Sequence, residues 1–563
     1  MKRSRSYASV MRRWYRPIEH ECPQCHRPLR QAMTLSKRTV ITLAGVIKLS
    51  HAGSRCPDLQ CTGHQRTYRS VEADALALPG FTYGLDIVLL VGQLRLGQHQ
   101  TVDEVHRELQ VRLASLGVSI SRREILYLFE AYCTLLRASS EAKDDQQWLA
   151  QVEKNGGIIV SVDGIQPEKG NETVYVVRDA LTGRVLAAEN VTSSETAVIK
   201  ALLAPVVALS VKVLGTITDA QESELMAVEQ LWPKVPHQVC QFHALRDASQ
   251  LAFEADKQVK TAMRKTLQPK VRALRRQLKG DSAQASTSEA EQFCVLDEYA
   301  SGVLSALNRD GLAPFDFATV HSAEDLDEVE ASEAAAGKKG GAVSWLCGQR
   351  LARLQTIVAE RAVWASQQAQ VKGMHGWLLQ IEHLLDSSWA QEGEEVSNET
   401  VGSRLDGWCE QMTDPLSDGT LSDLEHECLT RFLCVLANLR SHLVQCYDRK
   451  DFPRTNNEME RSIRGLKTRS RRISGHKNWN SYLLRYGRSV AYYDWWEQDA
   501  AHHQQLVEHT AHLDPARWRN MRRETSTAQS EQLQRFRFRH KRQAYLASLE
   551  ARWETAAPTL PLP

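Results

Sequence analysis

The pattern of apolar and polar residues changes character several times along the chain. Short continuous apolar runs, which are typical of buried strands, are concentrated between residues 157 and 243, whereas apolar residues recur at helical spacing over most of the remaining chain. These changes predict six segments: 1–75, 76–150, 151–249, 250–450, 451–500 and 501–563. A chain of 563 residues is too long for one hydrophobic core, so several folding units are expected.

The segment 151–249 alternates between strands and helices. In chain order, its pattern predicts a strand at 158–162, two strands within 172–191, a helix at 193–209, a strand at 211–218, a helix at 220–233 and a strand running into a helix at 237–248. This order resembles that of a ribonuclease H-like α/β core, whose first and fourth strands lie side by side. Asp163 and Asp219 follow those two strands, so we expect both carboxylates at one edge of the sheet.

Two helical stretches in the segment 76–150 are separated by a short glycine-containing break. The second helix opens at Ser121, and Glu124 three residues later completes a predicted capping box. Arg122 and Arg123 then lie in its first turn, where the recognition helix of a helix-turn-helix meets DNA. We expect a DNA-binding helix-turn-helix, although a helical hairpin packed inside the protein has the same pattern.

The segment 250–450 is predicted to be an all-helical insertion, interrupted by an exposed loop at 321–342 that is rich in acidic and small residues. The core is expected to resume in 451–500, and the last segment reads as basic helices and a tail. An apolar run at 85–96 is too short to cross a bilayer, so we interpret it as a core helix and expect no membrane role.

Composition changes this picture little, because 42% hydrophobic and 25% charged residues are ordinary for a globular protein. A net charge of +2 does not decide whether the chain binds nucleic acid, since 70 basic and 68 acidic residues can cancel overall while forming separate patches. The basic N-terminus leads into no secretory signal, so we expect a cytoplasmic protein.

The first segment contains two close cysteine pairs, Cys22–Cys25 and Cys56–Cys61, on either side of a stretch with strand character. Four thiolates on two tight turns match the tetrahedral preference of Zn²⁺ and leave no open position for chemistry. We therefore predict a structural zinc-ribbon-like site. Four unligated cysteines, or His26 or His64 in place of one cysteine, are the alternatives.

A further carboxylate comes from a short motif at 456–461. The string Asn-Asn-Glu-Met-Glu-Arg resembles the N-N-x-x-E-R signature of DDE transposases from bacterial insertion sequences, which places the metal-binding glutamate at Glu460. Glu458 is the alternative, and because the two side chains point about 200° apart on a helix, only one can face the aspartates. Asn456 and Asn457 would cap this helix.

Three carboxylates that converge from separate elements can hold two Mg²⁺ or Mn²⁺ ions about 4 Å apart and leave positions for phosphate and water. Asp163 would bridge the ions, with Asp219 and Glu460 on opposite sides. Taken singly, each aspartate would be interpreted as a strand-end turn or a helix cap. The combination of the three favours a catalytic metal site.

A second point of resemblance is Cys240-Gln-Phe-His243, a C-x-x-H motif found after the second aspartate in Mutator-like, hAT and related transposases. We expect His243 to lie beside the catalytic centre and to contact a DNA phosphate or orient a carboxylate. A zinc site at Cys240 and His243, or a buried core histidine, are the alternatives.

The helix that follows Glu460 is strongly basic. A charge run is usually a solvated face, but one that begins at a catalytic carboxylate would lie along the cleaved strand and neutralise its phosphates. The candidate DNA-binding residues of this stretch are Arg461, Arg464, Lys467, Arg471, Arg472 and Lys477.

The resemblance implies a transposase that binds the terminal repeats of its own element, cleaves DNA 3′ ends by two-metal hydrolysis and joins them to target DNA by transesterification. It implies double-stranded DNA as partner, a homodimer or larger oligomer that holds two ends, and a location on the bacterial nucleoid. The alternatives are a transposase-derived DNA-binding regulator that does not cleave, and a ribonuclease H-like nuclease or resolvase.

Overall fold

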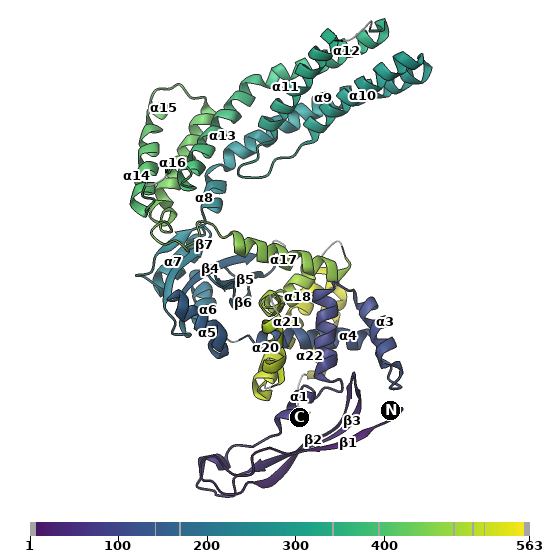
Figure 1. Ribbon diagram of the computed structural model, residues 1–563, viewed down its shortest axis with the longest axis vertical. Helices are drawn as coiled ribbons and strands as arrows, with labels where there is room; N and C mark the ends of the chain where they lie inside the picture. The colour runs from purple at the N-terminus through teal and green to yellow at the C-terminus, as the bar shows by residue number, and fades with distance from the viewer. Residues whose placement is uncertain are drawn as a thin grey trace, which may run out of the picture. The chain divides into compact units, whose positions relative to one another are not determined.

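The computed structural model describes residues 7–140, 142–167, 170–339, 343–391, 394–476, 479–497, 500–511 and 513–556. The chain divides into two compact units. The first unit comprises Met1–Leu214 and Asn457–Pro563, and the second comprises Gly215–Asn456. The fold is mixed α/β, with two small sheets and a large helical part, as the sequence predicts (Figure 1).

A three-stranded sheet opens the first unit. Its strands are β1 (Met11–Tyr15), β2 (Arg30–Thr42) and β3 (Gly45–Arg55). They are ordered β1-β3-β2, with β1 parallel and β2 antiparallel to β3. Tyr15, Val40 and Leu49 are buried on one face together with alanines of α1 (Val71–Leu76) and the residue after it. Lys37, Lys48 and Trp14 are exposed on the other face.

The other α-helices of the first unit come from the two separate parts of the chain that form it. They are α2 (Leu85–Gly92), α3 (Val102–Ala114), α4 (Arg122–Ala138), α5 (Gln146–Asn155), α6 (Thr196–Val207), α17 (Asn457–Ser474), α18 (Asn480–Val490), α19 (Tyr493–Glu497), α20 (Ala500–Ala511), α21 (Pro515–His540) and α22 (Arg542–Ala556). The predicted start of α4 is confirmed, because Ser121 and Glu124 form a complete capping box. None of the helices in the described part of the chain has the length and hydrophobicity of a membrane span.

The larger sheet has five strands in the order β6-β5-β4-β7-β8. They are β4 (Ile158–Ile165), β5 (Thr173–Asp179), β6 (Val185–Val191), β7 (Val213–Thr218) and β8 (His237–Val239). Strands β4 to β6 form an antiparallel meander, whereas β7 and β8 are parallel. The boundary between the two units falls inside β7, after Leu214. The predicted order of three strands, helix, strand, helix and strand is confirmed.

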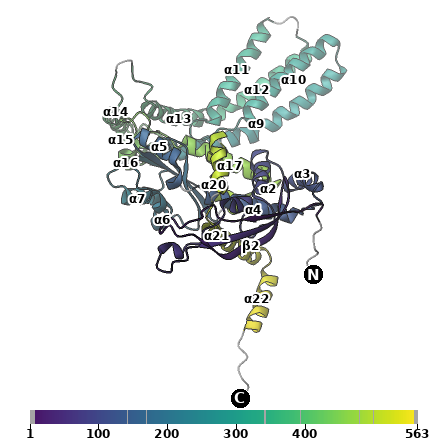
Figure 2. The same cartoon turned by 60° about the horizontal axis from the view of Figure 1, so that its bottom comes forward.

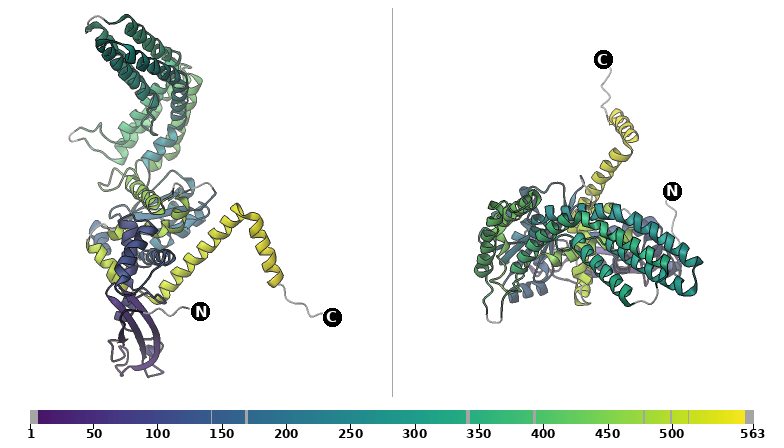
Figure 3. Two further views of the ribbon diagram at one scale, coloured as in Figure 1. Left: turned by 90° about the vertical axis from the view of Figure 1, so that its right-hand side faces the viewer. Right: turned by 90° about the horizontal axis from the view of Figure 1, so that it is seen from above.

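The second unit is built mainly from helices. They are α7 (Glu222–Leu231), α8 (Gln241–Ala248), α9 (Gln250–Gln284), α10 (Thr287–Asn308), α11 (Ala318–Lys339), α12 (Trp345–Ala359), α13 (Ala365–Leu385), α14 (Asn398–Gln411), α15 (Thr413–Ser417) and α16 (Asp423–Leu443). One hydrophobic core lies between α8, α13, α14 and α16, and another lies between α9, α10, α11 and α12. Helices α9, α10, α11 and α12 lie alongside one another in every view (Figure 1, Figure 2 and Figure 3).

The expected exposed loop at 321–342 is wrong for the residues described there, because α11 extends from Ala318 to Lys339. Ala and Glu dominate this stretch, and both are strong helix formers. The carboxylate of Asp256 in α9 accepts the backbone N–H groups of Ala318 and Thr319 at 3.0 and 2.7 Å, which satisfies the start of the helix. Helix α11 was not predicted because its hydrophobic periodicity is weak and its start is stabilised by Asp256, which is far away in the sequence.

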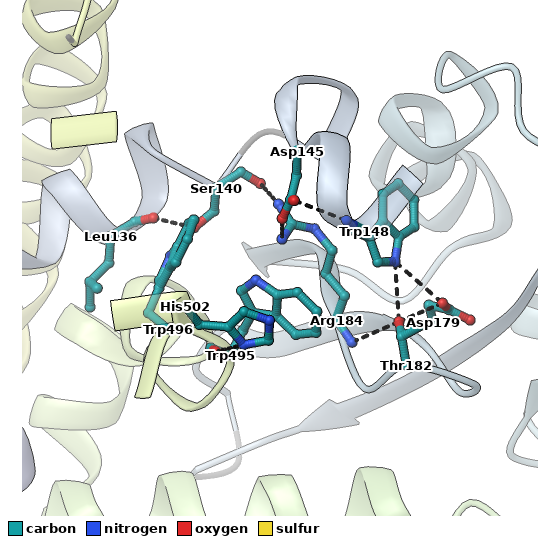
Figure 4. A network of polar contacts seen from close by, with 10 residues as sticks. All are labelled: Leu136, Ser140, Asp145, Trp148, Asp179, Thr182, Arg184, Trp495, Trp496 and His502. Atoms are coloured by element: carbon teal, nitrogen blue, oxygen red, sulfur yellow. Dashed lines mark hydrogen bonds and ion pairs between the residues drawn. The ribbon is translucent and has the colours of Figure 1, made fainter. Parts of the chain in front are cut away.

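A buried ion pair joins α5 to the β5–β6 hairpin in the first unit (Figure 4). Arg184, which is 1% exposed, pairs with Asp145, and its guanidinium lies 5.0 to 5.9 Å from the ring centres of Trp148, Trp495 and Trp496. Because three aromatic rings exclude water, each charge depends on its partner for compensation.

Replacing Arg184 by Met should therefore lower the free energy of unfolding by about 3–5 kcal/mol, since it leaves the Asp145 carboxylate buried without its cation. Urea titration followed by tryptophan fluorescence measures the change. The matched control is Arg112→Met, which removes an exposed pair with Glu108 and should cost less than about 1 kcal/mol. Equal costs in the two variants would contradict this interpretation.

Candidate functional site

The two cysteine pairs come together at the open end of the β2–β3 hairpin. The Sγ atoms of Cys22 and Cys61 are 3.8 Å apart, those of Cys25 and Cys56 are 3.4 Å apart, and all four lie within 4.8 Å of one another. A tetrahedral zinc ion with Zn–S bonds of about 2.3 Å would hold its sulfurs about 3.8 Å apart. The four cysteines therefore form a cluster that could bind zinc.

Local backbone turns place each thiol of this cluster. Before β2, the N–H of His26 donates to the carbonyl of Cys22 at 2.8 Å, and His26 adopts a left-handed conformation with a φ of 55°. After β3, Cys61 caps a short helical turn by accepting the N–H of Gly63 at 3.3 Å. His64 does not replace a cysteine, because its Nδ1 lies 2.7 Å from the carbonyl oxygen of Cys56.

The surroundings of the cluster favour a thiolate at Cys22. Burial raises the pKa of Cys22, but hydrogen bonds from the backbone N–H groups of Gln24 and Cys25 and from the side chains of Tyr68 and Cys25 together outweigh it and lower this pKa to about 6. Burial raises the pKa of Cys56 to about 12. A metal ion bound there would keep all four thiolates deprotonated, including that of Cys56.

The first unit carries Asp163 and Glu460 on two elements that contact each other. Asp163 lies in β4 with 8% of its surface exposed, and its carboxylate accepts the N–H of Gly164 at 2.6 Å. Strand β4 continues past the predicted end to Ile165, because it keeps pairing with β5 up to Val174. Glu460 is in the first turn of α17, which packs against β4.

The two glutamates of the motif differ in their surroundings. Glu458 is 71% exposed at its side chain and pairs with Arg461 on the surface of α17. Glu460 is half-buried, and its Oε1 atom is inaccessible to solvent. The start of the helix is held from β5, where Arg178 donates from Nη1 to the carbonyl of Glu458 at 3.0 Å. Of the two, Glu460 is the carboxylate turned away from solvent.

The second unit brings Asp219, Cys240 and His243 together. Asp219 follows β7, Cys240 precedes α8, and His243 lies in the first turn of α8. Nδ1 of His243 lies 2.8 Å from Oδ1 of Asp219. Burial alone would lower the pKa of His243, but the hydrogen bonds to Asp219 and Cys240 outweigh it and raise this pKa to about 10. The histidine thus lies in direct contact with the Asp219 carboxylate.

Cys240 has a role that the sequence did not indicate. Its buried Sγ accepts the backbone N–H of Asn456 at 3.3 Å, and the N–H of Gln241 donates to the carbonyl of Arg454 at 3.1 Å. The start of α8 thereby holds the chain segment that leads into α17. Asp219, Cys240 and His243 each place one ligand atom within 4.8 Å of the other two, so these residues could also hold a metal ion.

The basic residues predicted on α17 share one exposed face of the helix. Arg461, Arg464, Lys467, Arg471 and Arg472 are all exposed, and most of them recur at intervals of three or four residues. The opposite face is buried with Met459, Ile463, Leu466 and Ile473. Lys477 lies outside the described residues.

Tyr127 in the second turn of α4 is 41% exposed, but most of the exposed residues of this helix lie in its first turn. Arg122 and Arg123 are exposed there, and Arg122 pairs with Asp103 of α3 at 2.7 Å. Beyond this turn α4 packs against α2, α3, α18 and α21 and buries most of its residues. A helix enclosed in this way can offer DNA its N-terminal end but no long recognition face.

No protein-family model matches the chain, and no curated protein matches it. Among solved structures, the chain is similar to the Drosophila P element transposase strand transfer complex, with 9% sequence identity and a TM-score of 0.29. The similarity covers 72% of this chain and 91% of that chain. A similarity at this TM-score supports no conclusion about activity.

The zinc interpretation predicts that Gly63→Ala weakens metal binding, because a Cβ at this position would lie 2.5 Å from the Sγ of Cys22. We expect zinc affinity to fall at least about tenfold, as it does when the outer shell of a metal site is disturbed. Competition with a chromogenic chelator measures the loss.

The control for this variant is Gly376→Ala in α13, where a new Cβ meets no atom within 4 Å. It should retain the zinc content and affinity of the wild type. Wild-type zinc affinity in Gly63→Ala would contradict a site built on Cys22.

Proposed function

We propose that this chain is a metal-dependent DNA transposase of the DDE kind, in which Asp163, Asp219 and Glu460 together hold two Mg²⁺ or Mn²⁺ ions. It would bind the terminal repeats of its element, cleave DNA 3′ ends by hydrolysis and join them to target DNA by transesterification. The five-stranded sheet would be its ribonuclease H-like core, and the helices between β8 and α17 would be an insertion.

The observation that carries this proposal is the packing of α17 on β4. Asp163 and Glu460 are separated by almost 300 residues in sequence, yet the elements that bear them contact each other, and both side chains are at least half-buried. Like charges repel, so a fold that brings two carboxylates to adjoining elements is stabilised by a cation. The strand order supports the third member, because β7, which precedes Asp219, neighbours β4.

Each protein group would have a distinct part in the reaction. Bound divalent ions would activate a water or 3′-hydroxyl and stabilise the leaving oxygen. His243 would keep Asp219 in the orientation its metal role requires, since the two are in direct contact. The exposed basic face of α17 begins one residue after Glu460 and would neutralise the phosphates that flank the cleaved bond.

The proposal extends to an assembly on double-stranded DNA. Two element ends must be held together during strand transfer, so at least a homodimer would act. The N-terminal turn of α4 and the basic face of α17 are candidate contacts on the first unit.

The two glutamates of α17 provide a matched test. Glu460→Gln should reduce Mg²⁺-dependent cleavage of labelled element-end DNA by more than about a hundredfold, because even the loss of an outer-shell partner costs ten- to a hundredfold. Glu458→Gln makes the same chemical change two residues away on an exposed side chain and should retain most of the activity. Asp163→Asn and Asp219→Asn should behave like Glu460→Gln.

Other outcomes would favour other functions. DNA binding without cleavage in the wild type would indicate a regulator, and cleavage without strand joining would indicate a nuclease or resolvase. Equal activity in Glu460→Gln and Glu458→Gln would contradict the proposed ligand.

A further inference from the structure

The exposed face of the N-terminal sheet carries an unusual set of side chains. In the register of the sheet, Arg12 of β1 is opposite Lys48 of β3, and Lys48 is opposite Thr39 of β2. Two residues along, Trp14 is opposite Ser50, and Ser50 is opposite Lys37. Residues opposite each other in a sheet share a face, so these six side chains form one surface, with Arg12, Trp14, Lys37 and Lys48 exposed.

No acidic residue balances this surface from within the sheet. Strands β1, β2 and β3 contain neither Asp nor Glu, and residues 7–55 contain nine Arg or Lys against two Glu. Arg12 and Lys48 stand directly opposite each other on neighbouring strands about 4.8 Å apart, an arrangement that is destabilising for like charges. Stability alone does not account for such a placement, whereas an anionic partner would compensate it.

Trp14 adds a second signal on the same surface. Its side chain is 60% exposed, although the buried face of the same strand begins one residue later at Tyr15. A large exposed aromatic ring that lies among cations is typical of surfaces that bind nucleic acids, where the ring contacts sugars or bases and the cations contact phosphates.

We propose that this sheet face, defined by Arg12, Trp14, Lys37 and Lys48, is a surface that binds the phosphate backbone of double-stranded DNA. The choice of partner rests on the proposed function, which requires DNA. The surface is distinct from the first turn of α4 and from the basic face of α17. The cysteine cluster supports it, because a zinc ion held there would fix the open end of the two strands that bear Lys37 and Lys48.

The test compares two double variants that lose the same charge. Lys37→Gln/Lys48→Gln alters the sheet face, and Lys154→Gln/Lys234→Gln removes two exposed lysines elsewhere. Fluorescence anisotropy of a labelled random-sequence duplex, without added Mg²⁺ so that no strand is cut, gives the affinity of the full-length chain at several salt concentrations. Zinc content and thermal unfolding verify that each variant is folded.

We expect the sheet variant to bind about tenfold more weakly and to reduce the slope of log affinity against log salt by about 2, since each lost phosphate contact contributes about 0.9. The control variant should retain the wild-type slope. Trp14→Ala should weaken binding several-fold without changing the slope, because it removes no charge.

A sheet variant with the affinity and salt slope of the wild type would overturn this surface, and so would a sheet variant that lowers affinity for RNA but not for duplex DNA. Neither result would affect the proposed function, which is tested separately by cleavage in the Glu460→Gln and Glu458→Gln variants. A wild-type chain that binds no DNA would overturn both.

Discussion

The proposed metal centre depends on one constraint: after the long helical stretch, the chain must place Glu460 on a helix that packs against the strand of Asp163. Residue 460 lies 241 positions after residue 219, and most of the chain between them is helix with hydrophobic cores of its own. Within the second unit, two hydrogen bonds hold the returning segment at the start of α8, one to Cys240 and one from Gln241. Within the first unit, Arg178 holds the first turn of α17. Each contact closes a large loop within its own unit.

Contacts within the second unit suggest why Cys240 and His243 occur together in a C-x-x-H motif. Cys240 and His243 both lie at the N-terminal end of α8, but they act on different targets: the sulfur accepts a backbone N–H of the returning chain, and the imidazole contacts Asp219. Cys240 immediately precedes α8 and His243 lies in its first turn, so the start of one helix bears both side chains. The motif therefore contacts both Asp219 and the last residues of the second unit.

Local patterns in the sequence predicted most helices and strands, whereas contacts between residues far apart in the sequence could not be predicted from it. The capping box at Ser121, the strand that begins at Ile158 and the clustering of the four cysteines all followed from short patterns, and the structure confirms them. Helix α11 was missed because its start is satisfied by Asp256, a carboxylate more than 60 residues away. The contact between Cys240 and Asn456 spans 216 residues, and no local pattern encodes it. The motif left Glu458 as an alternative to Glu460, and the structure exposes Glu458 but half-buries Glu460.

The most direct test of the central claim is metal-directed cleavage of the polypeptide itself. Fe²⁺ can replace Mg²⁺ at oxygen ligands and, with ascorbate and peroxide, produces radicals that cut the backbone near the bound ion. If Asp163, Asp219 and Glu460 share one metal centre, cuts will appear next to all three residues, and excess Mg²⁺ will suppress them together. Cuts near only one of these residues, or cuts that Mg²⁺ does not suppress, would contradict a shared centre.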